Sequence, residues 1–156
     1  MQIRSPYASE LGDLAQLDGS IYGAQAYSVM TLRQFLDLAG PLLAVGVDES
    51  GIVGYSVVLP SFVRGQAWFM ALGVRVDRRR AGIGRVLAAR ALETAAKHDL
   101  DVIRLTVAPT NVAAIALYQG LGFVNESVVE EYFEAEDRVI LRKTLAVPAG
   151  FRPAFA

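Results

Sequence analysis

Residues 74–87 read VRVDRRRAGIGRVL and join an apolar strand to a helix that begins near Gly82. The N-terminus of a helix carries unpaired N–H groups and about half a positive charge, so it attracts anions. Gly82 and Gly84 allow the phosphates of a ligand to approach the backbone without meeting a Cβ atom. Arg79, Arg80 and Arg85 surround these glycines with cationic hydrogen-bond donors. We therefore predict that this turn binds two adjacent phosphates.

The spacing of the glycines argues against an ordinary dinucleotide-binding fold. In a Rossmann turn a third glycine follows three residues after the second, and Leu87 occupies that position here. A basic turn also separates the strand from Gly82. A basic strand-to-helix turn that binds no ligand is the alternative interpretation.

The composition indicates one compact domain. The chain has 156 residues, of which 53% are hydrophobic and 20% are charged, which is enough apolar material for a core and argues against disorder. We assign residues 1–145 to a single domain and residues 146–156 to a C-terminal tail. The tail is either an arm that covers a sheet edge or a contact in a homodimer.

Charge and cysteine content exclude several classes of function. With a net charge of −1, the overall charge does not recruit nucleic acid or an anionic membrane, and Arg78–Arg80 is the only dense basic cluster. With no cysteine and one histidine we expect no metal site. No stretch reaches the roughly 20 apolar residues of a membrane span, and we see no leader segment. We therefore expect a soluble, cytoplasmic protein.

Hydrophobic periodicity predicts an alternation of strands and helices. We expect strands over residues 2–4, 42–47, 52–59, 66–76, 102–107, 123–133 and 138–145. We expect helices that begin at Ser9 as an N-cap, at a Thr31–Gln34 capping box, near Gly82 and at Asn111.

The strand over residues 66–76 is apolar on both faces, so we predict that it is central in the sheet. Its Gly73 indicates a bulge or the close approach of a ligand. The strand–helix–strand order after it predicts a parallel crossover to residues 102–107. The buried face of the intervening helix is predicted to carry Ile83, Val86, Leu87 and Ala91.

A second motif, NVAAIALYQGLGF at residues 111–123, completes a family resemblance. This segment resembles the closing motif of the GNAT family of N-acetyltransferases, and Arg79-x-x-Gly82-x-Gly84 resembles the acyl-CoA pyrophosphate loop of that family. The end of the chain, YFEAEDRVIL at residues 132–141, is most similar to the bacterial ribosomal-protein and peptide N-alpha-acetyltransferases.

The resemblance implies a fold and a cofactor. The fold is α/β, with a mixed, twisted sheet of six or seven strands, helices on both faces and a central strand pair that splays apart. The pantetheine of acetyl-CoA would lie between the splayed strands, so residues 1–145 would form an acyl-CoA N-acyltransferase domain. Val76 departs from the proline common in the family. The cofactor-binding positions implied are Leu72, Gly73, Val74, Arg79, Arg80, Ala81, Gly82, Ile83, Gly84, Arg85, Asn111 and Tyr118.

Tyr118 matches the family's tyrosine near the thioester sulfur and is the predicted catalytic residue. Its phenol, with an ordinary pKa near about 10, can donate a proton to that sulfur. The backbone N–H of Val74, freed by the splay, would stabilise the carbonyl oxygen. The alternative is that Tyr118 only packs on the sheet.

A general base is missing from the expected place. Where the bacterial group often has a glutamate, this chain has Thr106, which cannot take a proton at neutral pH. An α-amino group, with a pKa near about 8, needs less help than a lysine at about 10.4. Alternatively Glu126, Glu130 or Glu131 could reach the cleft; because Glu130 and Glu131 are adjacent on a strand, at most one of the two would face it.

These features predict an acetyl-CoA-dependent N-acetyltransferase. The acceptor is a primary amine, with a peptide or protein N-terminus first and small amines such as amino acids, polyamines or antibiotics next. A non-catalytic acyl-CoA-binding module is a second hypothesis, motivated by Thr106. Binding of nucleic acid through Arg78–Arg80 is disfavoured, because three arginines provide few phosphate contacts.

Overall fold

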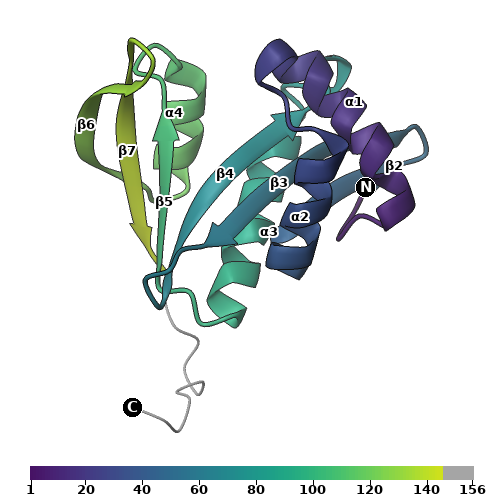
Figure 1. Ribbon diagram of the computed structural model, residues 1–156, viewed down its shortest axis with the longest axis horizontal. Coiled ribbons are helices and arrows are strands. Elements are labelled where there is room, and N and C mark those ends of the chain that lie inside the picture. Colours follow the sequence, from purple (N-terminus) through teal and green to yellow (C-terminus); the bar gives the residue numbers. More distant parts are fainter. Residues whose placement is uncertain (146–156) are drawn as a thin grey trace, which may run out of the picture.

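The computed structural model describes residues 1–145, which form a seven-stranded mixed sheet covered by helices on both faces (Figure 1). The strands are β1 (Gln2–Arg4), β2 (Leu43–Asp48), β3 (Gly51–Pro60), β4 (Gln66–Val74), β5 (Val102–Val107), β6 (Val124–Phe133) and β7 (Glu136–Thr144). Their order in the sheet is β1-β2-β3-β4-β5-β7-β6. The predicted fold class and the central place of β4 are confirmed. The predicted tail, residues 146–156, lies outside the described residues.

The parallel pair β4 and β5 is joined along only part of its length. Gln66–Trp68 pair with Val102–Arg104, whereas β4 continues to Val74 and β5 to Val107. The two strands therefore lie side by side at their N-terminal ends and diverge toward their C-terminal ends (Figure 1). The predicted splay and the parallel crossover are confirmed.

The helices divide between the two faces of the sheet. They are α1 (Leu11–Tyr22), α2 (Val29–Ala39), α3 (Ile83–Lys97) and α4 (Val112–Gly120). Consecutive residues of β3 identify the faces, because the Tyr55 side chain reaches Asp18 of α1 while a Cβ at Gly54 would meet Leu87 of α3. One hydrophobic cluster packs under α1 and α2, and a larger one packs under α3 and α4. In the described part of the chain, no helix combines the length and apolar character that a membrane span requires.

Two predicted helix starts are wrong in detail. The N-cap of α2 is Ser28, whose Oγ accepts a hydrogen bond from the Thr31 N–H at 3.1 Å, so Thr31 is inside the helix. Before α1, a 3-10 turn spans Ala8–Glu10, and the Glu10 carboxylate accepts from the Tyr7 N–H at 2.8 Å. The cap therefore comes from Glu10, which Arg4 also holds, and not from Ser9.

The end of β4 and the buried face of α3 also differ from the prediction. β4 ends at Val74, because the Arg78 N–H donates to the Arg75 carbonyl and closes a 3-10 turn over Val76–Arg78. Val86 is half exposed and is not part of the core. The residues that α3 buries are Leu87, Ala88, Ala91, Leu92 and Ala95. Val86 precedes Leu87 by one position, or about 100° around the helix, which turns it toward solvent.

Gly73 makes room for a side chain of the protein. The bulge lies at Met70, since Val57 pairs with Ala71 and Val58 pairs with Phe69. At Gly73 the register is regular, but an added Cβ would lie 2.5 Å from Cε1 of Tyr55. The absent side chain at Gly73 thus accommodates the Tyr55 ring.

We expect Gly73→Ala to destabilise the fold, because its methyl group would overlap Tyr55 and would approach Cδ1 of Ile21 at 3.0 Å. Overpacking of this kind costs about 1–3 kcal/mol. Gly12→Ala is the matched control, since nothing lies within 4 Å of its Cβ and alanine is the better helix former. Urea denaturation of both variants measures the difference. Equal stability of the two would contradict the role given to Gly73.

Candidate active site

A cavity of about 870 Å³ occupies the gap where β4 and β5 diverge. Its walls come from α1, β4, the start of α3, β5, α4 and β7. Eleven of the twelve predicted cofactor-binding residues line it: Leu72, Gly73, Val74, Arg79, Arg80, Gly82, Ile83, Gly84, Arg85, Asn111 and Tyr118. Ala81 is not among its lining residues. The fold therefore brings together both sequence motifs, which are about 30 residues apart along the chain.

The backbone of β4 turns alternate residues toward this cavity. The Arg75 N–H donates to the Val53 carbonyl of β3 at 2.9 Å. In an antiparallel ladder the hydrogen-bonded pairs alternate, so Gly73 directs its N–H and C=O toward β3. Leu72 and Val74 direct theirs into the gap.

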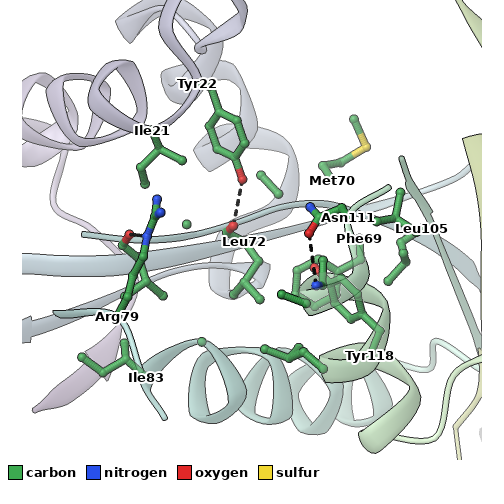
Figure 2. Close-up of a pocket in the computed structure, with 18 of the residues that line it drawn as sticks. Ile21, Tyr22, Phe69, Met70, Leu72, Arg79, Ile83, Leu105, Asn111 and Tyr118 are labelled. Atoms are coloured by element: carbon green, nitrogen blue, oxygen red, sulfur yellow. Dashed lines mark hydrogen bonds between the residues drawn. The ribbon is translucent and has the colours of Figure 1, made fainter. Parts of the chain in front are cut away.

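Two side chains already use carbonyls on this exposed edge. The Tyr22 hydroxyl of α1 donates to the Leu72 carbonyl at 2.9 Å, and Nε of Arg79 donates to the Val74 carbonyl at 3.3 Å. Figure 2 shows Tyr22 and Arg79 approaching β4 from different sides, with Tyr118 beyond Leu72. The edge of β4 thus binds polar groups as a strand binds its neighbour.

The start of α3 forms the positively charged end of the cavity. Gly82 adopts a left-handed conformation with φ of 77°, and its carbonyl accepts from the Val86 N–H at 3.1 Å. The N–H groups of Ile83, Gly84 and Arg85 precede this bond and have no acceptor within the helix.

The arginines of this turn have different partners. Arg78 pairs with Asp48 at 2.8 Å and so ties the turn to the β2–β3 hairpin. Arg85 donates to the Gly120 carbonyl at 3.4 Å and links α3 to α4. Arg79 and Arg80 also line the cavity. Both lie within three residues of Gly82 along the chain, and Arg79 also bonds the Val74 carbonyl.

Tyr118 is held between two aromatic rings. It packs edge-on against Phe69 at 5.7 Å and against Phe123 at 5.5 Å between ring centroids, and it is only 8% exposed. Burial, with a smaller contribution from Tyr22, raises the pKa of Tyr118 above the usual value for a phenol. Its hydroxyl therefore stays protonated at neutral pH, as a proton donor requires.

Asn111 fixes the start of α4. Its side-chain oxygen accepts a hydrogen bond from the Ala114 N–H at 3.2 Å, as predicted for an N-cap. That bond leaves the amide NH2 group of Asn111 facing the cavity region as a donor (Figure 2).

Asp18 is a cavity residue that the sequence interpretation missed. It is fully buried in α1, where it accepts hydrogen bonds from the Tyr27 N–H at 2.6 Å and from the Tyr55 hydroxyl. Burial and the bond to Asp18 raise the pKa of Tyr55. The sequence signal for Asp18 is its position four residues after Leu14, on the buried face of α1.

The glutamates considered as bases do not line the cavity. Glu126 pairs with Arg104 at 2.9 Å and with Arg142 at 3.8 Å, and the Arg104 bond holds its pKa below the usual range. Glu130 and Glu131 are exposed, on a part of β6 where the pairing with β7 is irregular. Among the described residues that line the cavity, Asp18 is the one carboxylate.

Comparisons with known proteins agree with this geometry. The sequence model described as the acetyltransferase (GNAT) family matches residues 11–123. The ribosomal protein bS18-alanine N-acetyltransferase of Escherichia coli strain K12 is 32% identical over 72 residues, covering 46% of this chain and 49% of that protein. The chain thus matches about half the length of this curated relative.

Solved structures share the fold along most of the chain. Ard1 from Thermoplasma volcanium superposes with a TM-score of 0.84 at 18% identity, covering 93% of this chain and 97% of that one. Arabidopsis thaliana Naa50, in complex with the bisubstrate analogue CoA-Ac-MVNAL, superposes with a TM-score of 0.79 at 22% identity, covering 91% and 97%. At sequence identities of 18% and 22%, the similarity to these two structures shows a shared fold and no more.

We expect Asp18→Asn to loosen the segment between α1 and α2. Both carboxylate oxygens accept from donors, so an amide NH2 would face one of these donors without an acceptor. A broken buried hydrogen bond of this kind costs about 1–3 kcal/mol. Chemical denaturation should show this loss, and Asp13→Asn, at an exposed position of the same helix, should change stability much less. Equal effects would refute the anchoring role.

Proposed function

The chain belongs to the GNAT family of acetyltransferases, and we propose that it transfers the acetyl group of acetyl-CoA to the α-amino group of a peptide or protein N-terminus. One feature carries this proposal. The cavity between β4 and β5 leads from the N-terminus of α3 to Tyr118. A ligand with phosphates at one end and a reactive thioester at the other matches that sequence of environments.

The cavity residues fit acetyl-CoA along its length. The N–H groups at the start of α3, together with Arg79 and Arg80, would hold the diphosphate. Leu72 and Val74 would hydrogen-bond the amides of the pantetheine as a neighbouring strand would, and Asn111 would donate to the same arm. The thioester supplies an activated acetyl carbon.

The protein side of the reaction needs two groups. As the amine nitrogen bonds to the acetyl carbon, a backbone N–H on the exposed edge of β4, that of Leu72 or Val74, would stabilise the negative charge on the carbonyl oxygen. When the carbon–sulfur bond breaks, Tyr118 would donate its proton to the sulfur. The proton that the amine loses would leave through water, and Tyr118 would regain a proton from the same solvent.

The cavity offers no free carboxylate as a general base among the described residues, which favours an acceptor whose amine has a low pKa. The cavity-lining carboxylate among the described residues, Asp18, is fully buried and already hydrogen-bonded twice. About a tenth of an α-amino group with a pKa near 8 is neutral at pH 7, whereas a lysine amine is almost entirely protonated. The name of the bS18-alanine N-acetyltransferase and the bisubstrate analogue CoA-Ac-MVNAL in the Naa50 complex also support a protein or peptide acceptor.

We expect Tyr118→Phe to reduce kcat by about 100- to 10,000-fold, the usual contribution of general acid catalysis. The phenylalanine ring keeps the packing against Phe69 and Phe123, so the affinity for CoA should change little. Release of CoA with an N-terminal peptide library and calorimetric binding of CoA measure the two quantities.

Tyr7→Phe is the control for Tyr118→Phe, because Tyr7 is exposed and does not line the cavity. Full activity of Tyr118→Phe would remove the general acid from the mechanism. Tight binding of CoA by the unmodified protein without transfer to any amine would instead favour a non-catalytic acyl-CoA-binding module.

We expect Gly84→Ala to weaken CoA binding without destabilising the fold. The new Cβ would lie 3.5 Å from Val74 and 3.6 Å from Leu117, ordinary contact distances, but it would project into the cavity that these residues line. Alanine also favours the helix. A loss of affinity of about 10-fold, the effect of roughly 1.4 kcal/mol, should appear in calorimetry while the melting temperature is kept. Unchanged affinity would exclude the α3 end as the CoA site.

A further inference from the structure

Arg138 is a cation at the cavity that the proposed reaction does not use. On β7, Ile140, two residues after Arg138, pairs with Thr106 of β5. Side chains of paired residues share a face and those of successive residues alternate. Arg138 therefore lies on the face of Thr106 and Ile140, opposite Val139 and Leu141, which pack under α3 and α4. Both Arg138 and Thr106 line the cavity.

This position separates Arg138 from the arginines at the start of α3. In the sheet, β5 lies between β4 and β7, so β7 is at least about 10 Å from β4 at ordinary strand spacing. Arg138 also lies on the face that α1 covers, with Tyr22 and Tyr27 lining the same cavity. The phosphates would bind at the other end, and Arg138 would face the acceptor.

Arg138 lacks a strong partner among the described residues. Its nearest acidic group is Glu136, at 3.7 Å, whose side chain is 55% exposed while that of Arg138 is 24% exposed. An ion pair of that length with an exposed carboxylate is weak and is screened by water. Asp18, the cavity carboxylate, accepts from Tyr27 and Tyr55. The Arg138 side chain is thus partly buried at the cavity, and its guanidinium is only weakly paired and able to bind an anion from outside.

We propose that Arg138 selects acceptors that carry a carboxylate close to the reacting amine. The planar guanidinium presents paired N–H donors that match the two oxygens of a carboxylate. This inference rests on the proposed function: for a peptide acceptor, the carboxylate is the side chain of an acidic residue beside the N-terminal residue. The α-carboxylate of a free amino acid offers the same chemistry.

The test compares acceptors that differ only in that charge. With saturating acetyl-CoA, kcat/KM is measured for peptides beginning Ala-Glu and Ala-Gln, and for free alanine and alaninamide. We expect the unmodified protein to prefer the acidic member of one pair by roughly 10- to 100-fold, as for a hydrogen bond to a charged group. Arg138→Gln should bring this ratio close to 1, and Arg138→Lys should leave an intermediate ratio.

Arg142→Gln is the matched control. Arg142 lies on the same strand and carries the same charge, but it faces Glu126 at 3.8 Å and does not line the cavity. It should keep the full preference of the unmodified protein. If Arg142→Gln abolished the preference as Arg138→Gln does, general charge and not the cavity position would be responsible, and the inference would fail.

Binding in the presence of CoA separates this inference from the proposed function. Calorimetric Kd values for the same acceptors show whether Arg138 recognises the carboxylate even if no acetyl group is transferred. If Arg138→Gln removes the preference but no acetyl group is transferred, or if free alanine is the only acceptor, the role of Arg138 is supported. The proposed acetylation of peptide N-termini is then discarded. Equal ratios in the unmodified protein and in Arg138→Gln, in both kcat/KM and Kd, overturn the role of Arg138.

Discussion

The short ladder between β4 and β5 is the constraint on which the rest of the structure depends. After three paired residues the strands diverge, and the edge of β4 loses the partner that a sheet would normally provide. Buried backbone N–H and C=O groups are costly when they are unpaired. Tyr22 and Arg79 satisfy two of the carbonyls, at Leu72 and Val74. The remaining polar groups leave the inner edge of the sheet able to hydrogen-bond an extended, amide-containing ligand, as the proposed function requires.

Aromatic side chains pack beside the gap on both faces of the sheet. On one face, Tyr118 of α4 packs between Phe69 of β4 and Phe123, which follows α4, so α4 is held beside the end of the paired part of β4. On the other, Tyr55 fills the space beside Gly73 and is anchored on Asp18. Both aromatic contacts border the gap, so the proposed proton donor and the proposed cofactor site lie in closely packed surroundings.

Much of the fold follows from periodicity and from glycine, because those signals are local. The strand over residues 102–107, the cap at Asn111 and the turn at Gly82 were all predictable in this way. The cap at Ser28 was missed because Thr31 offers similar chemistry three residues later. Asp18, Gly73 and Arg138 required tertiary information. Asp18 bonds Tyr55, which follows it by 37 positions, and Gly73 makes room for Tyr55, which precedes it by 18. Arg138 shares a face of the sheet with Thr106, which precedes it by 32 positions.

The distribution of charge in the cavity bears on the missing base. A nearby cation favours the neutral form of an amine and so lowers its pKa. Arginines stand at both ends of this cavity, while Asp18 is engaged with Tyr27 and Tyr55. An acceptor with a carboxylate would be attracted by Arg138, and that pairing would neutralise the one group on the acceptor that raises the pKa of its amine. Recognition of the acceptor and the pKa of its amine would then depend on the same guanidinium, while water would accept the proton that the amine loses.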